Sequence, residues 1–337
     1  MIKVGINGFG RIGRAFLHAS RSYPDIEVVG INDLGEAENL AYLLKYDSVY
    51  GHAEFPVSFE EGALIVDGKR ISVSKEKDPA MIKWGALGVD VVVESTGFFT
   101  EYAKAKAHLT GGAKRVVISA PAKGDAADGT TILMGANEKD FSKTAVTSNA
   151  SCTTNCTSPI VAILDATVGI DKALLNTVHA YTATQMIVDG PGGKADMRRG
   201  RAAALNIVPS STGAAKATAE VYTQLKGKFD GIALRVPVPA GSMADITFIA
   251  KRETTAEEVN DILRKAAQEP KWQGIYTATD ELLVSSDIVG DPHASIADLT
   301  MTRVIGNLVK VLAWYDNEMG YTHSLVRHVI EASKIKV

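Results

Sequence analysis

Hydrophobic and polar positions in the first 150 residues alternate between short β-branched runs and longer mixed segments. Four of the runs predict strands, at residues 3–7, 27–31, 89–93 and 115–118. Their nearly continuous apolar character suits a parallel sheet that is covered on both faces. Segments 11–22 and 102–110 predict helices, and segment 55–73 predicts a hairpin. This alternation of strand and helix indicates a doubly wound, Rossmann-type α/β sheet.

The pattern changes after about residue 150. Helices are predicted at residues 152–166, 213–225, 255–268 and 318–333, and strands at 174–181, 231–238 and 245–250. The helix at 255–268 begins with a capping box, in which Thr255 precedes Glu258 by three residues. A long loop is expected at 182–201, and loops of this length in compact domains are usually functional or lie in interfaces. We therefore expect a second, α+β domain with a largely antiparallel sheet.

Length and composition indicate a two-domain globular protein. The 337 residues predict a first domain of residues 1–151 and 316–337 and a second of residues 152–315. A net charge of −3 gives no support to binding of nucleic acid or an anionic membrane as a main role. Strand-like sequence begins at once, which leaves no room for a signal peptide, and two cysteines cannot build a disulfide framework. A cytoplasmic location is expected.

A glycine-rich turn follows the first predicted strand and opens the first predicted helix. Gly8, Gly10 and Gly13 form the G-x-G-x-x-G pattern, in which the glycines allow a tight turn, a close approach to a pyrophosphate and close helix–strand packing. Asp33 lies 20 residues beyond Gly13, at the end of the second strand, where a carboxylate accepts hydrogen bonds from a ribose. The pattern predicts a dinucleotide site, and an unliganded structural turn is the alternative.

Cys152 is placed at the start of a predicted helix, directly after a strand. Amides and the dipole at such a position favour a thiolate, so we expect a lowered pKa and a nucleophilic thiol. Cys156 lies one turn further on and is expected to be a small buried residue. The segment offers no closed set of metal ligands. His179, at the end of the next strand, is a candidate base, and the three features together suggest thiol-assisted aldehyde oxidation.

The sequence resembles phosphorylating glyceraldehyde-3-phosphate dehydrogenases over essentially its whole length. The matching blocks are residues 7–14, 151–156, 201–204, 209–216, 234–237 and 314–318. The block that contains Cys152 is highly specific to that family, whereas the glycine turn is shared with many dinucleotide-binding proteins. The resemblance implies NAD as the cofactor, glyceraldehyde 3-phosphate and inorganic phosphate as substrates, and a cytoplasmic homotetramer in which the 182–201 loop lies between subunits.

The resemblance also implies roles for individual residues. Cys152 resembles the thiolate that attacks the aldehyde, and His179 resembles the base that accepts the hydroxyl proton. The residues that resemble ligands of the substrate phosphate are Thr182, Arg199 and Arg235, and those for the attacking phosphate are Ser151, Thr153, Thr212 and Gly213. Ser151 and Thr153 also suit simple helix capping. The residues that resemble cofactor contacts are Gly8, Gly10, Arg11, Ile12, Gly13, Asp33, Lys77, Ser119 and Asn317.

Two other functions remain alternatives. One is the related erythrose-4-phosphate dehydrogenase, in which water rather than phosphate resolves the thioester; the intact Thr212-Gly213 block argues against it. The other is a non-catalytic nucleotide-binding module that acts in regulation or RNA binding. A non-catalytic module would not require a cysteine at position 152 or a histidine at position 179. The near-neutral charge balance also indicates no basic patch for RNA binding.

Overall fold

The chain forms two compact units in a computed structural model that describes residues 1–192 and 196–335. The first unit comprises Met1–Ala150 and Thr322–Val337, and the second comprises Ser151–Tyr321. Two segments of the predicted organisation lie outside the described residues: positions 193–195 of the expected loop and the last two residues of the expected first domain. Each unit is built around its own sheet, as the predicted fold class requires.

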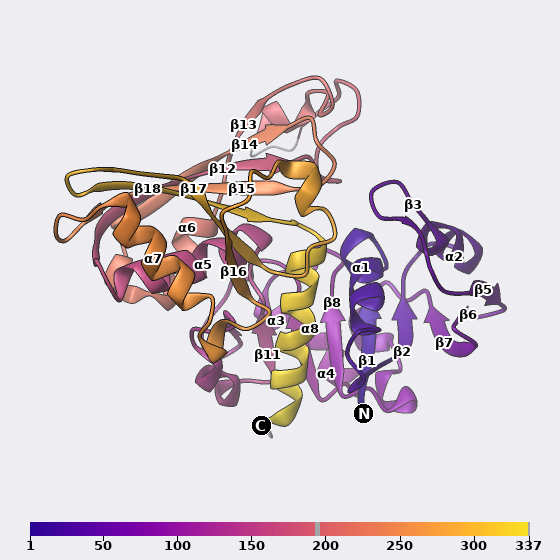
Figure 1. The fold of residues 1–337 in the computed structure, drawn as a ribbon. Coiled ribbons are helices and arrows are strands. Elements are labelled where there is room, and N and C mark those ends of the chain that lie inside the picture. The colour runs from indigo at the N-terminus through magenta and orange to yellow at the C-terminus, as the bar shows by residue number, and fades with distance from the viewer. Residues whose placement is uncertain (193–195, 336–337) are drawn as a thin grey trace. The chain divides into compact units, whose positions relative to one another are not determined.

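The first unit contains a nine-stranded sheet in the order β10-β11-β9-β8-β1-β2-β7-β6-β5 (Figure 1). Its strands are β1 (Ile2–Asn7), β2 (Ile26–Asn32), β5 (Val57–Glu60), β6 (Ala63–Val66), β7 (Lys69–Ser74), β8 (Val91–Glu94), β9 (Arg115–Ile118), β10 (Thr130–Thr131) and β11 (Val146–Ser148). The central pairs are parallel, and only β5, β6 and β7 pair in antiparallel fashion. The predicted hairpin is therefore a three-stranded edge; Gly62 and Gly68, in its two turns, both have positive φ. A separate two-stranded ladder joins β3 (Tyr46–Asp47) to β4 (Gly51–His52).

Helices of the first unit are α1 (Arg11–Ser20), α2 (Ala37–Lys45), α3 (Tyr102–Ala105), α4 (Ala107–Thr110) and most of α8 (Met319–Lys334). The helix predicted at residues 102–110 is divided at Lys106 into two short helices. Helix α8 is fixed by buried polar contacts, because His328 Nε2 lies 2.7 Å from Thr147 Oγ1 and Arg115 donates to the Ala332 carbonyl. Among the described residues, no helix has both the length and the apolar character needed to cross a membrane.

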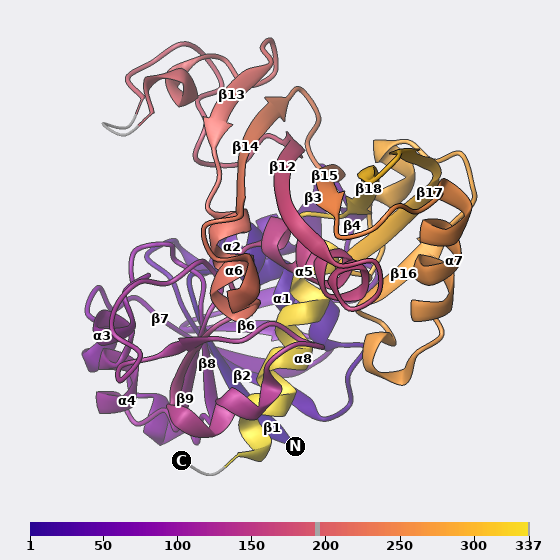
Figure 2. The same cartoon turned by 90° about the vertical axis from the view of Figure 1, so that its left-hand side faces the viewer.

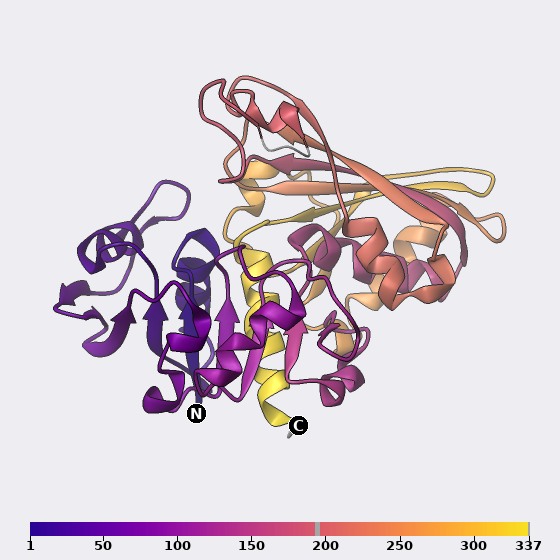
Figure 3. The ribbon, with the colours of Figure 1, turned by 180° about the vertical axis from the view of Figure 1, so that it is seen from behind.

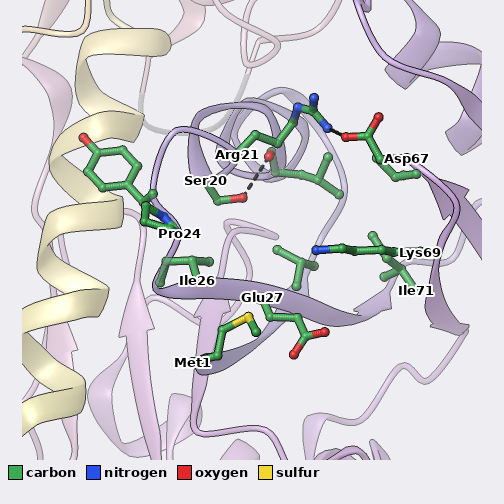
Figure 4. A pocket seen from close by; sticks show the side chains of 13 residues that line it. Met1, Ser20, Arg21, Pro24, Ile26, Glu27, Asp67, Lys69 and Ile71 are labelled. Atoms are coloured by element: carbon green, nitrogen blue, oxygen red, sulfur yellow. Dashed lines mark hydrogen bonds and ion pairs between the residues drawn. The ribbon is translucent and has the colours of Figure 1, made fainter.

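A small cavity of about 240 Å³ lies beside the carboxyl end of α1 (Figure 4). Arg21 forms an ion pair with Asp67 across its rim, and its guanidinium also lies 3.9 Å from the ring centre of Phe55. Asp67 has a positive φ of 50° in the turn between β6 and β7. These contacts attach the edge hairpin to α1.

The second unit contains a seven-stranded sheet in the order β13-β14-β12-β15-β18-β17-β16 (Figure 2). The strands are β12 (Ile170–Ala180), β13 (Val208–Ser211), β14 (Phe229–Val236), β15 (Ser242–Ala250), β16 (Tyr276–Thr279), β17 (Ser295–Ile305) and β18 (Leu308–Tyr315). Most pairs are antiparallel; β12 with β14 and β16 with β17 are parallel. The predicted α+β domain with a largely antiparallel sheet is confirmed.

Helices α5 (Cys152–Asp165), α6 (Ala214–Val221) and α7 (Ala256–Ala266) pack on one face of this sheet (Figures 1 and 3). The Thr255 hydroxyl caps α7 by accepting from the Glu258 amide, as predicted. The Glu258 carboxylate instead pairs with Arg252 and the Thr254 hydroxyl, so only half of the expected capping box forms.

Short 3-10 turns complete the two units. They are η1 (Pro79–Met81), η2 (Trp84–Leu87), η3 (Glu138–Lys143), η4 (Met197–Gly200), η5 (Thr223–Leu225), η6 (Pro270–Trp272) and η7 (Ser285–Ile288). Among them, η4 lies in the expected 182–201 loop and carries Arg199.

Candidate functional site

Cys152 is the first residue of α5, and the backbone before it is strained. Ala150 has a φ of 54°, a left-handed conformation that is costly for a residue with a Cβ and that is typical of functional turns. Ser151 then caps the helix, because its hydroxyl accepts from the Thr154 amide at 3.1 Å. The turn places the partly exposed Cys152 thiol at the helix N-terminus, whereas Cys156 is fully buried.

The structure brings together Cys152, His179 and Arg235. The Cys152 Sγ atom lies 3.4 Å from His179 Nε2, and the His179 side chain is buried at the end of β12. On the far side of the ring, Nδ1 lies 2.7 Å from the Ala180 carbonyl oxygen and 2.6 Å from Arg235 Nη1. Arg235 faces His179 because β12 and β14 pair in parallel at these residues. The thiol, the imidazole and the guanidinium thus form one continuous contact set.

Burial dominates the proton affinities at this site. It raises the pKa of the Cys152 thiol, and the charge of Arg235 and the hydrogen bonds at Thr153 oppose this effect without cancelling it. The expectation of a lowered thiol pKa is therefore wrong for this geometry: desolvation exceeds the effect of the helix N-terminus. Burial, followed by the charge of Arg235, lowers the pKa of His179 to about 3. At neutral pH the imidazole is uncharged and can accept a proton.

Tyr315 connects the cysteine turn to the sheet. Its hydroxyl lies 2.8 Å from both Thr153 Oγ1 and Thr177 Oγ1, and Thr177 donates to the Met243 carbonyl at 3.1 Å. Each hydroxyl has a single proton, so Tyr315 donates to Thr177 and accepts from Thr153. The Thr153 hydroxyl is thus engaged by Tyr315, and the Thr153 main-chain N–H, in the first turn of α5, is the donor that faces a ligand at the helix start.

The other predicted phosphate ligands lie at loop and helix ends in the same unit. Arg199 donates from Nε to the Ser210 hydroxyl at 3.0 Å, and its charge lowers the pKa of His179 and of Arg235. The Thr182 hydroxyl lies 3.0 Å from that of Thr184. Gly213 is the N-cap of α6, where open space surrounds the position of a Cβ, and the Thr212 hydroxyl accepts from the Ala214 amide.

The glycine-rich turn lines a cavity of about 570 Å³ in the first unit, together with Asp33, Lys77 and Thr96. Gly8 has a φ of +91°, and a Cβ there would lie 2.7 Å from the Thr96 nitrogen. A Cβ on Gly13 would lie 2.2 Å from the Gly8 carbonyl oxygen. Gly10 differs, because its Cβ would meet open space. The outer glycines serve the turn and the packing, and Gly10 leaves room for a ligand beside the uncapped N-terminus of α1.

Asp33 is rigidly held at this cavity. Its Oδ2 accepts from the Phe9 amide at 2.7 Å and its Oδ1 from the Gly35 amide at 2.8 Å. Each carboxylate oxygen keeps a further lone pair for a ligand hydroxyl. The Arg11 guanidinium pairs with Asp47, and the Ser119 amide donates to the Glu94 carbonyl, so the Ser119 side chain and carbonyl are the groups left to test as cofactor contacts. Arg11 and Ile12 can therefore contribute main-chain amides at the helix start.

A buried polar network, which the sequence did not reveal, supports the floor of the cavity. The Glu94 carboxylate accepts from the Asn7 side chain at 2.6 Å, from His108 Nε2 at 2.9 Å, and from the amide and hydroxyl of Thr96. Trp84 Nε1 donates to His108 Nδ1 at 3.0 Å, which places the ring proton on Nε2. Glu94 and Asn7 are the last residues of parallel strands, and Asp33 directly follows one; this shared position at strand ends is the signal that could have identified Glu94.

Comparisons with known proteins match both units. Residues 2–102 match the family model of the glyceraldehyde 3-phosphate dehydrogenase NAD binding domain, and residues 151–317 match that of the C-terminal domain. The chain is 52% identical over 329 residues to glyceraldehyde-3-phosphate dehydrogenase from Streptomyces coelicolor, with 96% of each chain covered. It is 48% identical over 340 residues to that of Clostridium pasteurianum, covering 99% of each, and 50% identical over 333 residues to that of Mycobacterium avium, covering 96% of each.

Proposed function

The chain belongs to the glyceraldehyde-3-phosphate dehydrogenase family, and on this premise we propose how its residues divide the work of the reaction. The enzyme oxidises D-glyceraldehyde 3-phosphate with NAD⁺ and inorganic phosphate to give 1,3-bisphosphoglycerate, a step of glycolysis. Membership of an enzyme family with this activity disfavours the alternative of a non-catalytic nucleotide-binding module. The observation that carries the residue assignment is the 3.4 Å contact between the thiol of Cys152 and the imidazole of His179.

Cys152 is the nucleophile in this proposal. Its sulfur adds to the aldehyde carbon, its proton passes to His179 Nε2, and Nε2 delivers that proton to the aldehyde oxygen, which gives a thiohemiacetal and a neutral imidazole. Burial disfavours a separated thiolate and imidazolium in the free protein, because it raises the pKa of the thiol and lowers that of His179, so the proton passes as the carbon–sulfur bond forms. In the tautomer that donates Nδ1–H to the Ala180 carbonyl, Nε2 presents its lone pair to the sulfur.

His179 then serves as the base for oxidation. It takes the hydroxyl proton of the thiohemiacetal while the C1 hydrogen leaves with its electron pair, which yields a thioester on Cys152. NAD⁺, when bound, supplies the acceptor for that hydride. Phosphate adds to the thioester carbon, and expulsion of the Cys152 sulfur releases the acyl phosphate. The low pKa of His179 keeps the imidazole uncharged at neutral pH, and because it also makes the imidazole a weak base, the proton is taken as the hydride leaves.

Two anion subsites are assigned to the second unit. We place the substrate phosphate with Thr182, Arg199 and Arg235, since guanidinium groups match phosphoryl oxygens in charge and geometry. The attacking phosphate is assigned to the groups at the starts of α5 and α6, namely Ser151, the Thr153 amide, Thr212 and Gly213. At Thr153 the amide is assigned this role, since the hydroxyl is engaged by Tyr315.

The dinucleotide is assigned to the cavity at the glycine-rich turn, and the residues present fit it. Space beside Gly10, the N-terminus of α1, where the N-cap Gly10 provides no side-chain cap, and the oriented Asp33 carboxylate suit a pyrophosphate followed by a ribose. Lys77 lines the same cavity. Ser119 and Asn317 remain proposed contacts, Asn317 for the nicotinamide carboxamide.

We place the enzyme in the cytoplasm as a homotetramer. The sheet face opposite helices α5, α6 and α7 exposes apolar side chains, with Leu174 66% and Ile232 55% exposed. Leu174 and Leu308 line one groove. Large exposed apolar surfaces of this kind mark interaction sites. The 182–201 loop adds Ile187, which is 86% exposed. Sedimentation velocity tests the stoichiometry, and a monomer at micromolar concentration contradicts it.

The residue assignment is tested by trapping the acyl-enzyme. The protein is mixed with NAD⁺ and glyceraldehyde 3-phosphate without inorganic phosphate, quenched in acid and digested. We expect the phosphoglyceroyl mass on the peptide that carries Cys152, and its loss when phosphate is added before the quench. The Cys156→Ser variant should give the same adduct. An adduct on another residue, or none despite NADH formation, would refute the covalent role of Cys152.

A further inference from the structure

Ser242 lies between the strand that carries the proposed base and the strand that ends two residues before the proposed nicotinamide contact, Asn317. It is the first residue of β15, which lies between β12 and β18 in the sheet. Met243 pairs with Val178 near the end of β12, and Ser242 pairs with Tyr315 at the end of β18. The side chain is 1% exposed, so its hydroxyl must find its partners within the protein.

The direction of its hydrogen bonds follows from counting protons. The Ala180 main-chain N–H donates to Ser242 Oγ at 3.0 Å. Ser242 Oγ lies 2.9 Å from Asn317 Oδ1 and supplies its own single proton to that oxygen. The alternative orientation of the Asn317 amide would leave the buried serine proton without an acceptor, which is costly. Asn317 is therefore fixed with its oxygen engaged and its Nδ2 as the remaining donor.

The same serine also supports the residue beside the base. Both main-chain polar groups of Ala180 are engaged. Its N–H donates to Ser242 Oγ, and its carbonyl oxygen lies 3.0 Å from Arg235 Nη1 and 2.7 Å from His179 Nδ1. One hydroxyl thus links the peptide that orients the imidazole to the amide of Asn317.

We propose that Ser242 is a positioning residue that fixes Asn317 as a hydrogen-bond donor and so selects a carbonyl acceptor on the nicotinamide ring. This inference rests on the proposed function, specifically on the assignment of Asn317 to the carboxamide. A carboxamide carries both an acceptor oxygen and a donor nitrogen. An asparagine locked by Ser242 recognises only the oxygen, whereas an unlocked asparagine can turn to meet either group.

The test compares binding of two dinucleotides by isothermal titration calorimetry, which needs no turnover. Thionicotinamide adenine dinucleotide replaces the carbonyl oxygen by sulfur, a weaker acceptor, so the parent protein should bind it several-fold more weakly than NAD⁺. In Ser242→Ala the dissociation constant for NAD⁺ should rise about tenfold, equivalent to about 1.4 kcal/mol, and the preference for NAD⁺ should fall towards one. Ser242→Thr keeps the hydroxyl and should retain both parent values. Ser142→Ala, at an exposed serine of the first unit outside the proposed sites, is the control and should change neither the dissociation constant nor the preference.

A second variant covers the case in which Ser242→Ala does not fold. Asn317→Asp retains an acceptor for Ser242 but has no donor for the ligand, so it should lose the NAD⁺ preference to a similar extent. The double variant should lose little more than either single variant, because both act on one hydrogen-bonded unit. An unchanged dissociation constant and an unchanged preference in Ser242→Ala would overturn the inference. A parent protein that does not bind NAD⁺ would instead contradict the proposed function.

Discussion

The two cysteines of α5 should differ in their rate of alkylation by at least about a hundredfold. Cys152 is partly exposed at the start of the helix, with a proton acceptor 3.4 Å from its sulfur. The Cys156 sulfur is fully buried, 3.7 Å from the Ala313 carbonyl and 3.8 Å from the Ser295 hydroxyl. Burial raises the pKa of both thiols, but the charge of Arg235 counteracts this at Cys152 and not at Cys156.

The magnitude follows from the opening that a reagent needs to reach Cys156. Its sulfur is covered by β18 and β17, so reaction requires local separation of helix and sheet. Stabilities of whole domains are about 5–15 kcal/mol. Even a local opening that costs only about 3 kcal/mol is populated less than about 1% of the time, which gives the hundredfold ratio.

The assay uses substoichiometric iodoacetamide, followed by digestion and mass spectrometry of the two cysteine peptides. Activity should fall in proportion to the label on Cys152. Cys156→Ser should keep most turnover and the same inactivation rate, while Cys152→Ser should fold, bind NAD⁺ and lose most turnover, because a hydroxyl is a far weaker nucleophile at neutral pH. Equal labelling of the two cysteines, or near-normal activity in Cys152→Ser, would refute this reasoning.

Three further predictions concern the base, the cofactor and acid stability. His179→Asn should lower kcat by about 10²- to 10⁴-fold and remove the limb of the pH–rate profile that belongs to the imidazole. If turnover and the pH–rate profile were both unchanged, another residue would have to be the general base. The Asp33 carboxylate should repel a 2′-phosphate by about 3 kcal/mol, which gives a preference for NAD⁺ over NADP⁺ of about a hundredfold in kcat/KM. Asp33→Ser should reduce this preference. Equal use of both cofactors by the parent protein would contradict the assignment of Asp33. Burial lowers the pKa of His328 to about 3. Between about pH 6.5 and 3 the unfolded chain therefore binds a proton that the folded chain does not, and the free energy of unfolding falls as the pH falls through that range. For this group the loss is about 2 kcal/mol between pH 6.5 and 5. Urea unfolding of the parent and of His328→Gln at pH 7.5 and 5 measures this loss, and an equal loss in both proteins would exclude His328 as its source.

Local patterns were sufficient to predict the elements that carry the chemistry. The glycine turn lies between β1 and α1, and Cys152 begins α5, as the sequence indicated. His179 lies near the end of the predicted strand, one residue before β12 ends at Ala180. Each of these depends on residues within a few positions of one another, where turn geometry and apolar periodicity decide the structure.

The contacts that complete the site depend on distant pairing, which the sequence does not encode locally. Tyr315 meets Thr153 and Thr177 across separations of 162 and 138 residues. Ser242 meets Asn317 only because β15 starts three residues before the predicted strand and pairs with β18. The thiol pKa also depends on tertiary burial, and for that reason the expectation based on the helix terminus had the wrong sign.

The most direct test of the account is NADH formation from glyceraldehyde 3-phosphate with and without inorganic phosphate. With phosphate, NADH should form continuously. Without it, NADH should form in a burst of about one equivalent per chain and then nearly stop, because the thioester on Cys152 has no phosphate to resolve it. The Cys152→Ser variant should give neither the burst nor turnover. Continuous NADH formation that does not depend on phosphate would contradict the account and would favour the erythrose-4-phosphate type of enzyme, in which water resolves the thioester.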